Sequence, residues 1–174
     1  MRALVVFESI FGNTRTVAEA IGQGLSATHE VEVVSVGAVT TEQVAAVDLL
    51  VVGGPTHVHG LSSEMSRSGV EDTAAKSGGE LLLDPDYDLG DLRHWFTTLL
   101  DVTAKGAAFD TRVDGPVLFT GHACKGIGAR LARHGYALVI DPESFLVDKQ
   151  TVLLPGEAAR ARAWGARVGA ACQS

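Results

Sequence analysis

Five short segments of this 174-residue chain are apolar at nearly every position and rich in β-branched residues. Strands of this kind are typical of a parallel sheet that is covered by helices on both faces. The second segment alternates partly with polar residues, which favours a place near the edge of the sheet. The five predicted strands are "ALVVF" (3–7), "VEVVSV" (31–36), "DLLVVGG" (48–54), "GPVLFTG" (115–121) and "ALVI" (137–140).

Segments with helical spacing separate these runs. Val17, Ile21 and Leu25 fall on one helix face, and Thr14 ahead of them is suited to capping. Strands that alternate with helices predict one doubly wound α/β domain over residues 1–174, with right-handed crossovers. Further helices are predicted at 41–47, 62–76, 92–100 and 127–134, and around 161–171, after Pro155 and Gly156.

Composition excludes several classes of function. The formal net charge is −7, so the chain has no electrostatic attraction to nucleic acid or to an anionic membrane. The two cysteines, Cys124 and Cys172, form no CxxC motif and suggest no disulfide framework. The chain begins with a strand pattern, and no apolar run is long enough to span a bilayer. We therefore expect a cytoplasmic protein.

The stretch "SIFGNT" (9–14) joins the first predicted strand to the first predicted helix. Gly12 allows a turn in which successive N–H groups point inward, and the helix adds its own unpaired N–H groups and its positive dipole end. Such a loop can hold a phosphate without a lysine or an arginine. It is neither a Walker loop nor a GxGxxG turn. The alternative is an ordinary capped strand–helix turn, since turns of this composition are common.

The segment "SIFGNT" after an amino-terminal strand resembles the phosphate-binding loop of flavodoxins. Two later segments resemble the loops that hold the flavin ring in that family, namely "GGPTHVHG" (53–60) and "TGHACKG" (120–126). The resemblance extends over essentially the whole chain. It implies a flavodoxin-like five-stranded parallel sheet of order 2-1-3-4-5, non-covalently bound flavin mononucleotide (FMN), and electron transfer with a reductase as redox partner. The cofactor-binding residues it implies are Ser9, Ile10, Phe11, Gly12, Asn13, Thr14, Pro55, Thr56, His57, Val58, His59, Gly60, Gly121, His122, Ala123 and Gly126.

Two departures from the family pattern bear on function. Flavodoxins usually carry a hydroxyl residue where this chain has Phe11, and they enclose the flavin ring with tryptophan or tyrosine. Here His57, His59 and His122 are the only planar rings in the corresponding loops. Two alternatives therefore stay open. One is an FMN-dependent oxidoreductase of the quinone or protoporphyrinogen type, and the other is a flavin-free binding module on the same fold. No acid–base pair or nicotinamide fingerprint indicates catalysis, and we expect no catalytic residue.

The same loops raise the question of a metal. His57, His59, His122 and Cys124 could together bind zinc, but unpaired loop histidines are common and we expect no metal.

The acidic stretch "DPDYDLGD" (84–91) begins with the aspartate spacing of a calcium loop, but it has Leu89 and Trp95 where that loop needs glycine and glutamate. We interpret it as a solvated loop, with an acidic docking surface for a basic redox partner as the alternative.

Overall fold

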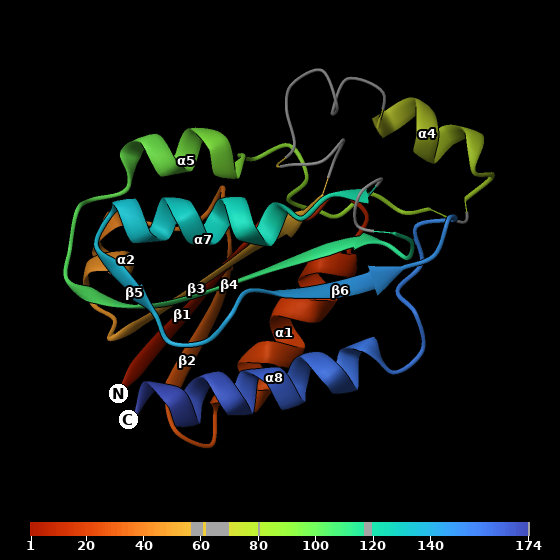
Figure 1. Ribbon diagram of the computed structural model, residues 1–174. Coiled ribbons are helices and arrows are strands. Elements are labelled where there is room, and N and C mark those ends of the chain that lie inside the picture. Colours follow the sequence, from red (N-terminus) through yellow and green to blue (C-terminus); the bar gives the residue numbers. More distant parts are fainter. Residues whose placement is uncertain (57–60, 62–69, 80, 117–119, 174) are drawn as a thin grey trace.

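The computed structural model describes residues 1–56, 61, 70–79, 81–116 and 120–173. Its centre is a parallel sheet in the order β2-β1-β3-β4-β5, with β6 also paired to β4 (Figure 1). This is the doubly wound, flavodoxin-like order predicted above, and β2 lies at the edge as its pattern indicated. The strands are β1 (Arg2–Phe7), β2 (Glu30–Ser35), β3 (Leu49–Pro55), β4 (Ala104–Val113), β5 (Tyr136–Leu138) and β6 (Glu143–Val147).

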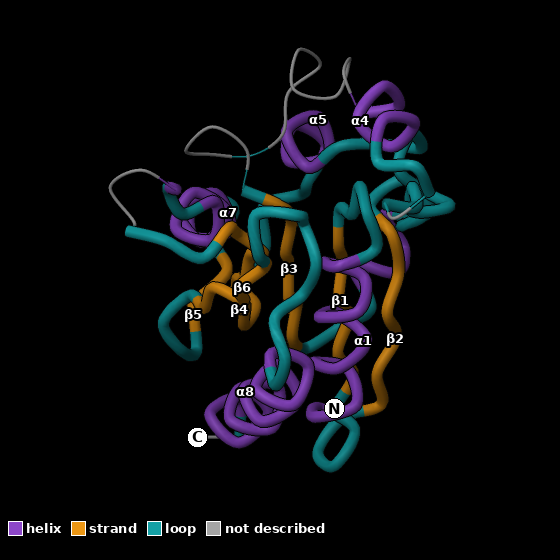
Figure 2. The backbone as a smooth tube through the Cα atoms, turned by 90° about the vertical axis from the view of Figure 1, so that its right-hand side faces the viewer, coloured by secondary structure: helices purple, strands orange, loops and turns teal. Residues whose placement is uncertain are grey.

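Helices cover both faces of the sheet (Figures 1 and 2). One face packs against α1 (Asn13–Leu25) and α8 (Glu157–Cys172), where Trp164 contacts Phe109 and Phe145 edge-on. The other face packs against α5 (Leu92–Thr98), α7 (Ala123–Arg133) and the short α2 (Thr41–Ala45). The remaining described helix is α4 (Val70–Lys76). No described helix has the length and apolar character needed to cross a membrane.

Glycines let α1 and α8 approach each other closely. A Cβ atom on Gly24 would collide with the carbonyl oxygen of Arg162, and one on Gly165 would collide with that of Ile21. Both obstacles are backbone atoms that cannot turn aside. The two helices therefore hold a fixed position, and the amino-terminal end of α1 is presented beside the carboxyl ends of the central strands.

The first three predicted strands are confirmed within one residue at each end, but the fourth was wrong. The fourth strand of the sheet is β4, and residues 115–116 and 120–121 of the predicted strand come after it, outside any named strand. The sequence of β4, "AKGAAFDTRV", has few β-branched residues, since Gly106 and Ala108 face the tightly packed α7 side. Tertiary packing thus overrode the local propensity on which the prediction rested.

The fifth predicted strand is confirmed only in part. The chain pairs with β4 through β5, breaks at residues 139–142, and pairs again through β6. Pro142 lies in the break, and it has no N–H group to donate to the sheet. The helix predicted over 127–134 begins earlier, at Ala123. The described part of the helix predicted over 62–76 is α4, and the rest lies outside the described residues.

Candidate functional site

The turn between β1 and α1 exposes a row of backbone donors. Gly12 is the residue before the helix and has φ 81° and ψ −15°, the left-handed conformation that glycine adopts without strain. No side chain caps the helix, and the N–H groups of residues 10–14 donate no hydrogen bond to any described residue. The first helical N–H that bonds back to the turn is that of Thr16, to the Gly12 carbonyl at 3.0 Å. An uncapped helix terminus of this kind has the donors and the dipole end that an anion needs, which makes the turn a candidate anion site.

Two polar side chains of the turn, those of Asn13 and Thr14, are already engaged. Asn13 Nδ2 donates to the Thr151 carbonyl at 2.7 Å, and Asn13 Oδ1 accepts from Leu153 N at 3.1 Å. Thr14 Oγ1 and Thr111 Oγ1 share a hydrogen bond of 2.8 Å. The turn is thus fastened to two segments far away in sequence, and the donors left for a ligand are backbone N–H groups and the Ser9 hydroxyl.

An ion pair holds the other side of the turn. The Asp84 N–H donates to the Ile10 carbonyl at 2.7 Å, and Arg15 donates to both oxygens of the Asp84 carboxylate, at 2.9 and 2.6 Å. Burial opposes ionisation of Asp84, but the bonds from Arg15 and from the Asp86 N–H outweigh it, so the pKa of Asp84 is lowered. Ser9 Oγ is buried beside Asp84 and contributes to this lowering, although it forms no hydrogen bond of ordinary geometry with the described residues.

The turn opens onto a cavity of about 180 Å³ at the carboxyl ends of the strands. This is the position where ligands bind in doubly wound sheets. Six of its lining residues were predicted from the sequence, and five were not. The five were not predicted because the fourth strand was expected after residue 114 and β6 was not expected. Anticipated were Ile10, Phe11, Asn13, Thr14, Pro55 and Thr56, and missed were Thr111, Arg112, Val113, Val147 and Thr151.

Thr56 connects this cavity to the start of α7. Its hydroxyl donates to Asp110 Oδ2 at 3.0 Å and accepts from the Ala123 N–H at 3.0 Å. Asp110 Oδ2 also accepts from the Cys124 N–H at 2.8 Å. Asp110 and Thr56 therefore cap α7 in place of a local capping residue, since the His122 side chain makes no cap hydrogen bond. A threonine–aspartate pair of this kind, with the aspartate buried, holds the two neighbouring strand ends in register.

The remaining predicted site residues divide into two groups. Gly121, His122, Ala123 and Gly126 are not among the residues lining the cavity at the turn. Gly121 is left-handed at φ 74°, Ala123 and Gly126 belong to α7, and His122 Nδ1 lies 3.2 Å from Ser144 Oγ. His57, Val58, His59 and Gly60 lie outside the described residues, so their predicted contacts to a flavin ring stay predictions.

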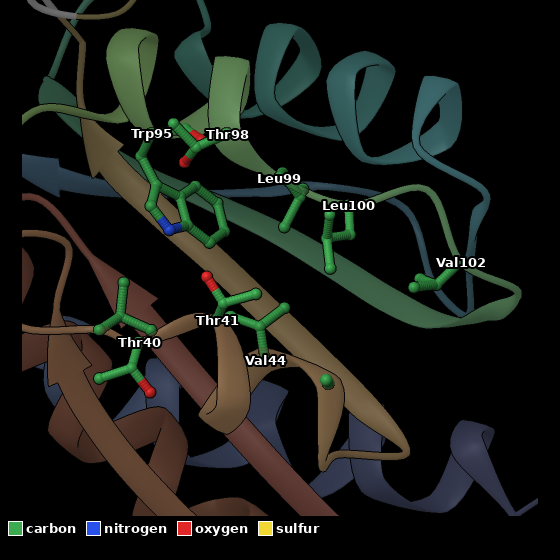
Figure 3. A pocket seen from close by; sticks show the side chains of 10 residues that line it. Thr40, Thr41, Val44, Trp95, Thr98, Leu99, Leu100 and Val102 are labelled. Carbon is green, nitrogen blue, oxygen red and sulfur yellow. The ribbon is translucent and has the colours of Figure 1, made fainter.

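A second, smaller pocket of about 70 Å³ lies between α2 and α5 (Figure 3). Trp95 from α5 faces Thr41 and Val44 from α2 across it. No charged side chain lines this pocket. The start of α2 beside it is already capped by Thr40 and Gln43, so the pocket is a weaker candidate for a phosphate than the uncapped turn at Gly12.

The acidic stretch 84–91 is mainly structural. Asp84 is buried, Asp86 Oδ2 accepts from Arg15 at 2.7 Å, and Asp91 caps α5 through the His94 N–H at 2.8 Å. The prediction of a solvated loop is therefore wrong for Asp84, whereas Asp86 and Asp91 are half-buried, and a docking surface there would have Asp88 as its main exposed carboxylate.

A family model described as flavodoxin matches residues 5–93, which span β1 to the beginning of α5. The chain belongs to the flavodoxin family. Solved flavodoxins share its fold along their whole length. A flavodoxin from the domain Archaea superposes with a TM-score of 0.67 at 19% identity, covering 100% of both chains. Flavodoxin 1 from Bacillus cereus gives 0.63 at 18%, covering 97% of both.

Two-electron reduced flavodoxin from Megasphaera elsdenii gives a TM-score of 0.60 at 18% identity, covering 99% of both chains. None of the curated proteins matches the chain. At these identities the solved structures establish the fold, and the family assignment comes from the sequence model. A flavin cofactor, typically FMN, is characteristic of the flavodoxin family.

Proposed function

We propose that this chain, acting as one flavodoxin-like domain, binds FMN non-covalently and carries electrons between partner proteins. The observation that carries the proposal is the row of unpaired N–H groups at residues 10–14, at the uncapped start of α1 and at the mouth of a cavity. This arrangement fits a terminal phosphate, because the donors are fixed by the backbone and reinforced by the helix dipole.

The absence of a basic side chain from this loop distinguishes between flavins. Arg15, the nearest cation in the sequence, is committed to Asp84 and Asp86. The loop therefore recognises its ligand through hydrogen-bond geometry, which suits a single terminal phosphate. Riboflavin lacks this phosphate, and in flavin–adenine dinucleotide the phosphate is esterified and carries an adenylate.

The rest of the cavity would orient the ring. Pro55 and Thr56 at the end of β3 and Arg112 and Val113 at the end of β4 line it. The Arg112 guanidinium donates to the carbonyl oxygens of Val113 and Gly115 and to Thr120 Oγ1, at 3.1–3.2 Å, and so holds the segment that follows β4. The flavin would supply the redox chemistry, and these residues would bind and orient it.

Covalent catalysis by Cys124 is disfavoured by the state of its thiol. Cys124 is buried, and desolvation together with the charge of Asp110 raises the pKa of its thiol to about 12. The thiol is therefore protonated at neutral pH and unsuited to attack a substrate. The carboxylate of Asp110 is engaged with Thr56 and the start of α7.

Calorimetric titration of the flavin-free chain tests the cofactor. We expect FMN to bind more tightly than riboflavin or flavin–adenine dinucleotide, because FMN alone presents a terminal phosphate to the turn. Equal affinities for FMN and riboflavin would contradict the assignment of residues 9–14 to phosphate binding.

A matched pair of glycine variants tests the turn itself. Gly12 and Gly156 both precede a helix with φ near 80–90° (81° and 88°), and a Cβ on either meets nothing within 4 Å. Valine at either position introduces strain of about 1–3 kcal/mol in the left-handed conformation. Without FMN, the turn at residue 12 can change conformation and relieve this strain. Binding of FMN would then require the strained conformation again, and this free-energy cost corresponds to about 5–150-fold weaker binding.

We therefore expect Gly12→Val to lose FMN affinity with its circular dichroism retained. Gly156→Val should be destabilised to a similar extent but keep its FMN affinity. Similar FMN affinities in the two variants would show that the turn at Gly12 does not hold the phosphate.

A further inference from the structure

Three potential metal ligands meet at the carboxyl end of β4, on the α7 face of the sheet. A carboxylate oxygen of Asp110, a ring nitrogen of His122 and Cys124 Sγ all lie within 4.8 Å of one another. They come from β4, from the residue before α7 and from the first turn of α7. A carboxylate, an imidazole and a thiol are the donors that zinc takes in proteins.

The carboxylate carries a lone acceptor. Asp110 is completely buried, and its Oδ2 accepts from Thr56 and from the Cys124 N–H. Its Oδ1 is also buried and has no hydrogen-bond partner among the described residues. Buried acceptors are nearly always satisfied, so a carboxylate oxygen left in this way indicates a missing partner. A positive ion beside His122 and Cys124 would provide one.

Ser144 of β6 supports the other two donors. Its Oγ lies 3.2 Å from His122 Nδ1 and 3.6 Å from Cys124 Sγ. Outer hydrogen-bond partners of this kind fix the ring orientation of a metal-binding histidine. The cluster therefore has donors of three types together with a residue that orients two of them.

We propose that Asp110, His122 and Cys124 form a binding site for a zinc-like divalent cation, with water as the fourth ligand. As the metal–sulfur bond forms, the Cys124 thiol releases its proton to solvent. This site goes beyond the proposed flavin function, and it replaces the zinc ligands considered from the sequence. It keeps His122 and Cys124 and adds a buried carboxylate that the sequence did not reveal.

A route for the ion is present. An open cavity of about 460 Å³ is lined by His122, Cys124 and Ser144, so an ion can reach the half-buried His122 from it, with the buried Cys124 in its wall. Arg160 also lines it, but its charge is balanced by Glu143 at 2.9 Å and Glu157 at 2.6 Å. Arg112 and Lys125, also in the lining, are the cations that oppose entry.

Cobalt is the most direct probe of this site. The full chain, freed of flavin and treated with a chelator, would be titrated with Co²⁺ and then with Zn²⁺ in competition. We expect one Co²⁺ per chain, visible bands of a four-coordinate ion and a near-ultraviolet sulfur-to-cobalt band that Zn²⁺ abolishes. Titration of the same preparation with FMN reports on the flavin site separately, so failure of one proposal leaves the other testable.

Matched cysteine variants identify the ligand. Cys124 and Cys172 are both buried and free, and Cys172 lies at the end of α8. We expect Cys124→Ser to lose the sulfur band and Cys172→Ser to keep it. We also expect Asp110→Asn and His122→Ala to weaken Zn²⁺ binding. Loss of a residue that only hydrogen-bonds to a metal ligand lowers metal affinity by roughly 10–100-fold, and loss of a ligand itself should lower it by at least as much.

The proposal is overturned if the native chain shows no sulfur band, or if the band persists in Cys124→Ser. It is equally overturned if Zn²⁺ affinity is unchanged in both Asp110→Asn and His122→Ala. Should Cys124→Ser fail to fold by circular dichroism, His122→Ala decides the matter, because that side chain is half-buried and lies outside the hydrophobic core. Unchanged Zn²⁺ affinity in that variant would then refute the site.

Discussion

The ion pair between Arg15 and Asp84 is the interaction whose removal should have the clearest consequence. The Asp84 side chain is 1% exposed, and Arg15, at 29%, donates two hydrogen bonds to it and a third to Asp86. Removing one partner of a buried pair costs about 3–5 kcal/mol, because a buried charge is left without compensation. Since Arg15 is partly exposed and water can approach the pair, the lower end of about 3 kcal/mol applies.

The variant to make is Arg15→Met. Methionine keeps an apolar stem beside Phe7, whose ring centroid lies 4.9 Å from the Arg15 guanidinium carbon, so that mainly the charge is lost. For a domain of this size, a loss of about 3 kcal/mol lowers the melting temperature by about 6–12 °C. Urea unfolding followed by circular dichroism would give the free energy directly. FMN affinity should fall as well, because Asp84 also holds the carbonyl of Ile10.

The stability difference between the native chain and Arg15→Met should depend on pH in a definite direction. The pKa of Asp84 is lowered in the folded chain, so its contribution to stability is complete above the unfolded carboxyl pKa of about 4 and is lost as the pH falls through the folded pKa. In Arg15→Met, burial without the arginine should raise this pKa instead. The stability difference between the native chain and the variant is therefore expected to be largest at neutral pH and to shrink towards about pH 3.

Asp86→Asn is the matched control. Asp86 is 31% exposed and accepts a single hydrogen bond from Arg15, so its loss should cost under about 1 kcal/mol. If Arg15→Met proves no less stable than Asp86→Asn, or if its deficit is the same at neutral and acid pH, the buried ion pair does not stabilise the turn at residues 9–14.

Three further predictions concern the turn, the helix packing and the reaction. Asn13→Ala should cost about 1–3 kcal/mol in urea unfolding and weaken FMN binding, because it frees the loop at Thr151; equal FMN affinity would contradict that link. Gly165→Ala should lower the free energy of unfolding by about 1–3 kcal/mol, because its Cβ would clash with the backbone of Ile21. Gly126→Ala, whose Cβ would meet a flexible side chain, should be neutral or stabilising, and equal effects of the two substitutions would show that α1 and α8 are not closely packed at Gly165. In stopped-flow absorbance, the bound flavin should be reduced slowly by NADH or NADPH alone and quickly once a ferredoxin-type reductase is added; rapid saturable reduction by a nicotinamide alone would indicate an enzyme.

Local sequence was sufficient for the first half of the fold. β1 and β3 are apolar at nearly every position because both faces of each strand are covered, and this pattern can be read without knowing the partner. The same holds for the turn at Gly12, since a small-residue loop between an apolar strand and an amphipathic helix restricts the backbone within a few residues. These features depend on neighbours in sequence, and sequence analysis therefore found them.

The second half depended on contacts that no local pattern contains. β4 owes its place to pairing with β3 and to close packing by α7, which favours Gly106 and Ala108 over the β-branched residues that mark a strand. Nothing in the local sequence distinguishes Asp110 from other acidic residues. Only the register of β4 brings its carboxylate to the start of α7, where it accepts a hydrogen bond from the Cys124 N–H.

The functional side chains illustrate the same division. The sequence determined that residues 9–14 form a loop with free backbone donors, because glycine and a helix start are sufficient for that. It did not determine that Asn13 is committed to Leu153, 140 residues away, or that Arg15 is committed to Asp84, 69 residues away. Such pairs form because the order and register of the strands bring their segments together, and that information exists only once the sheet has assembled.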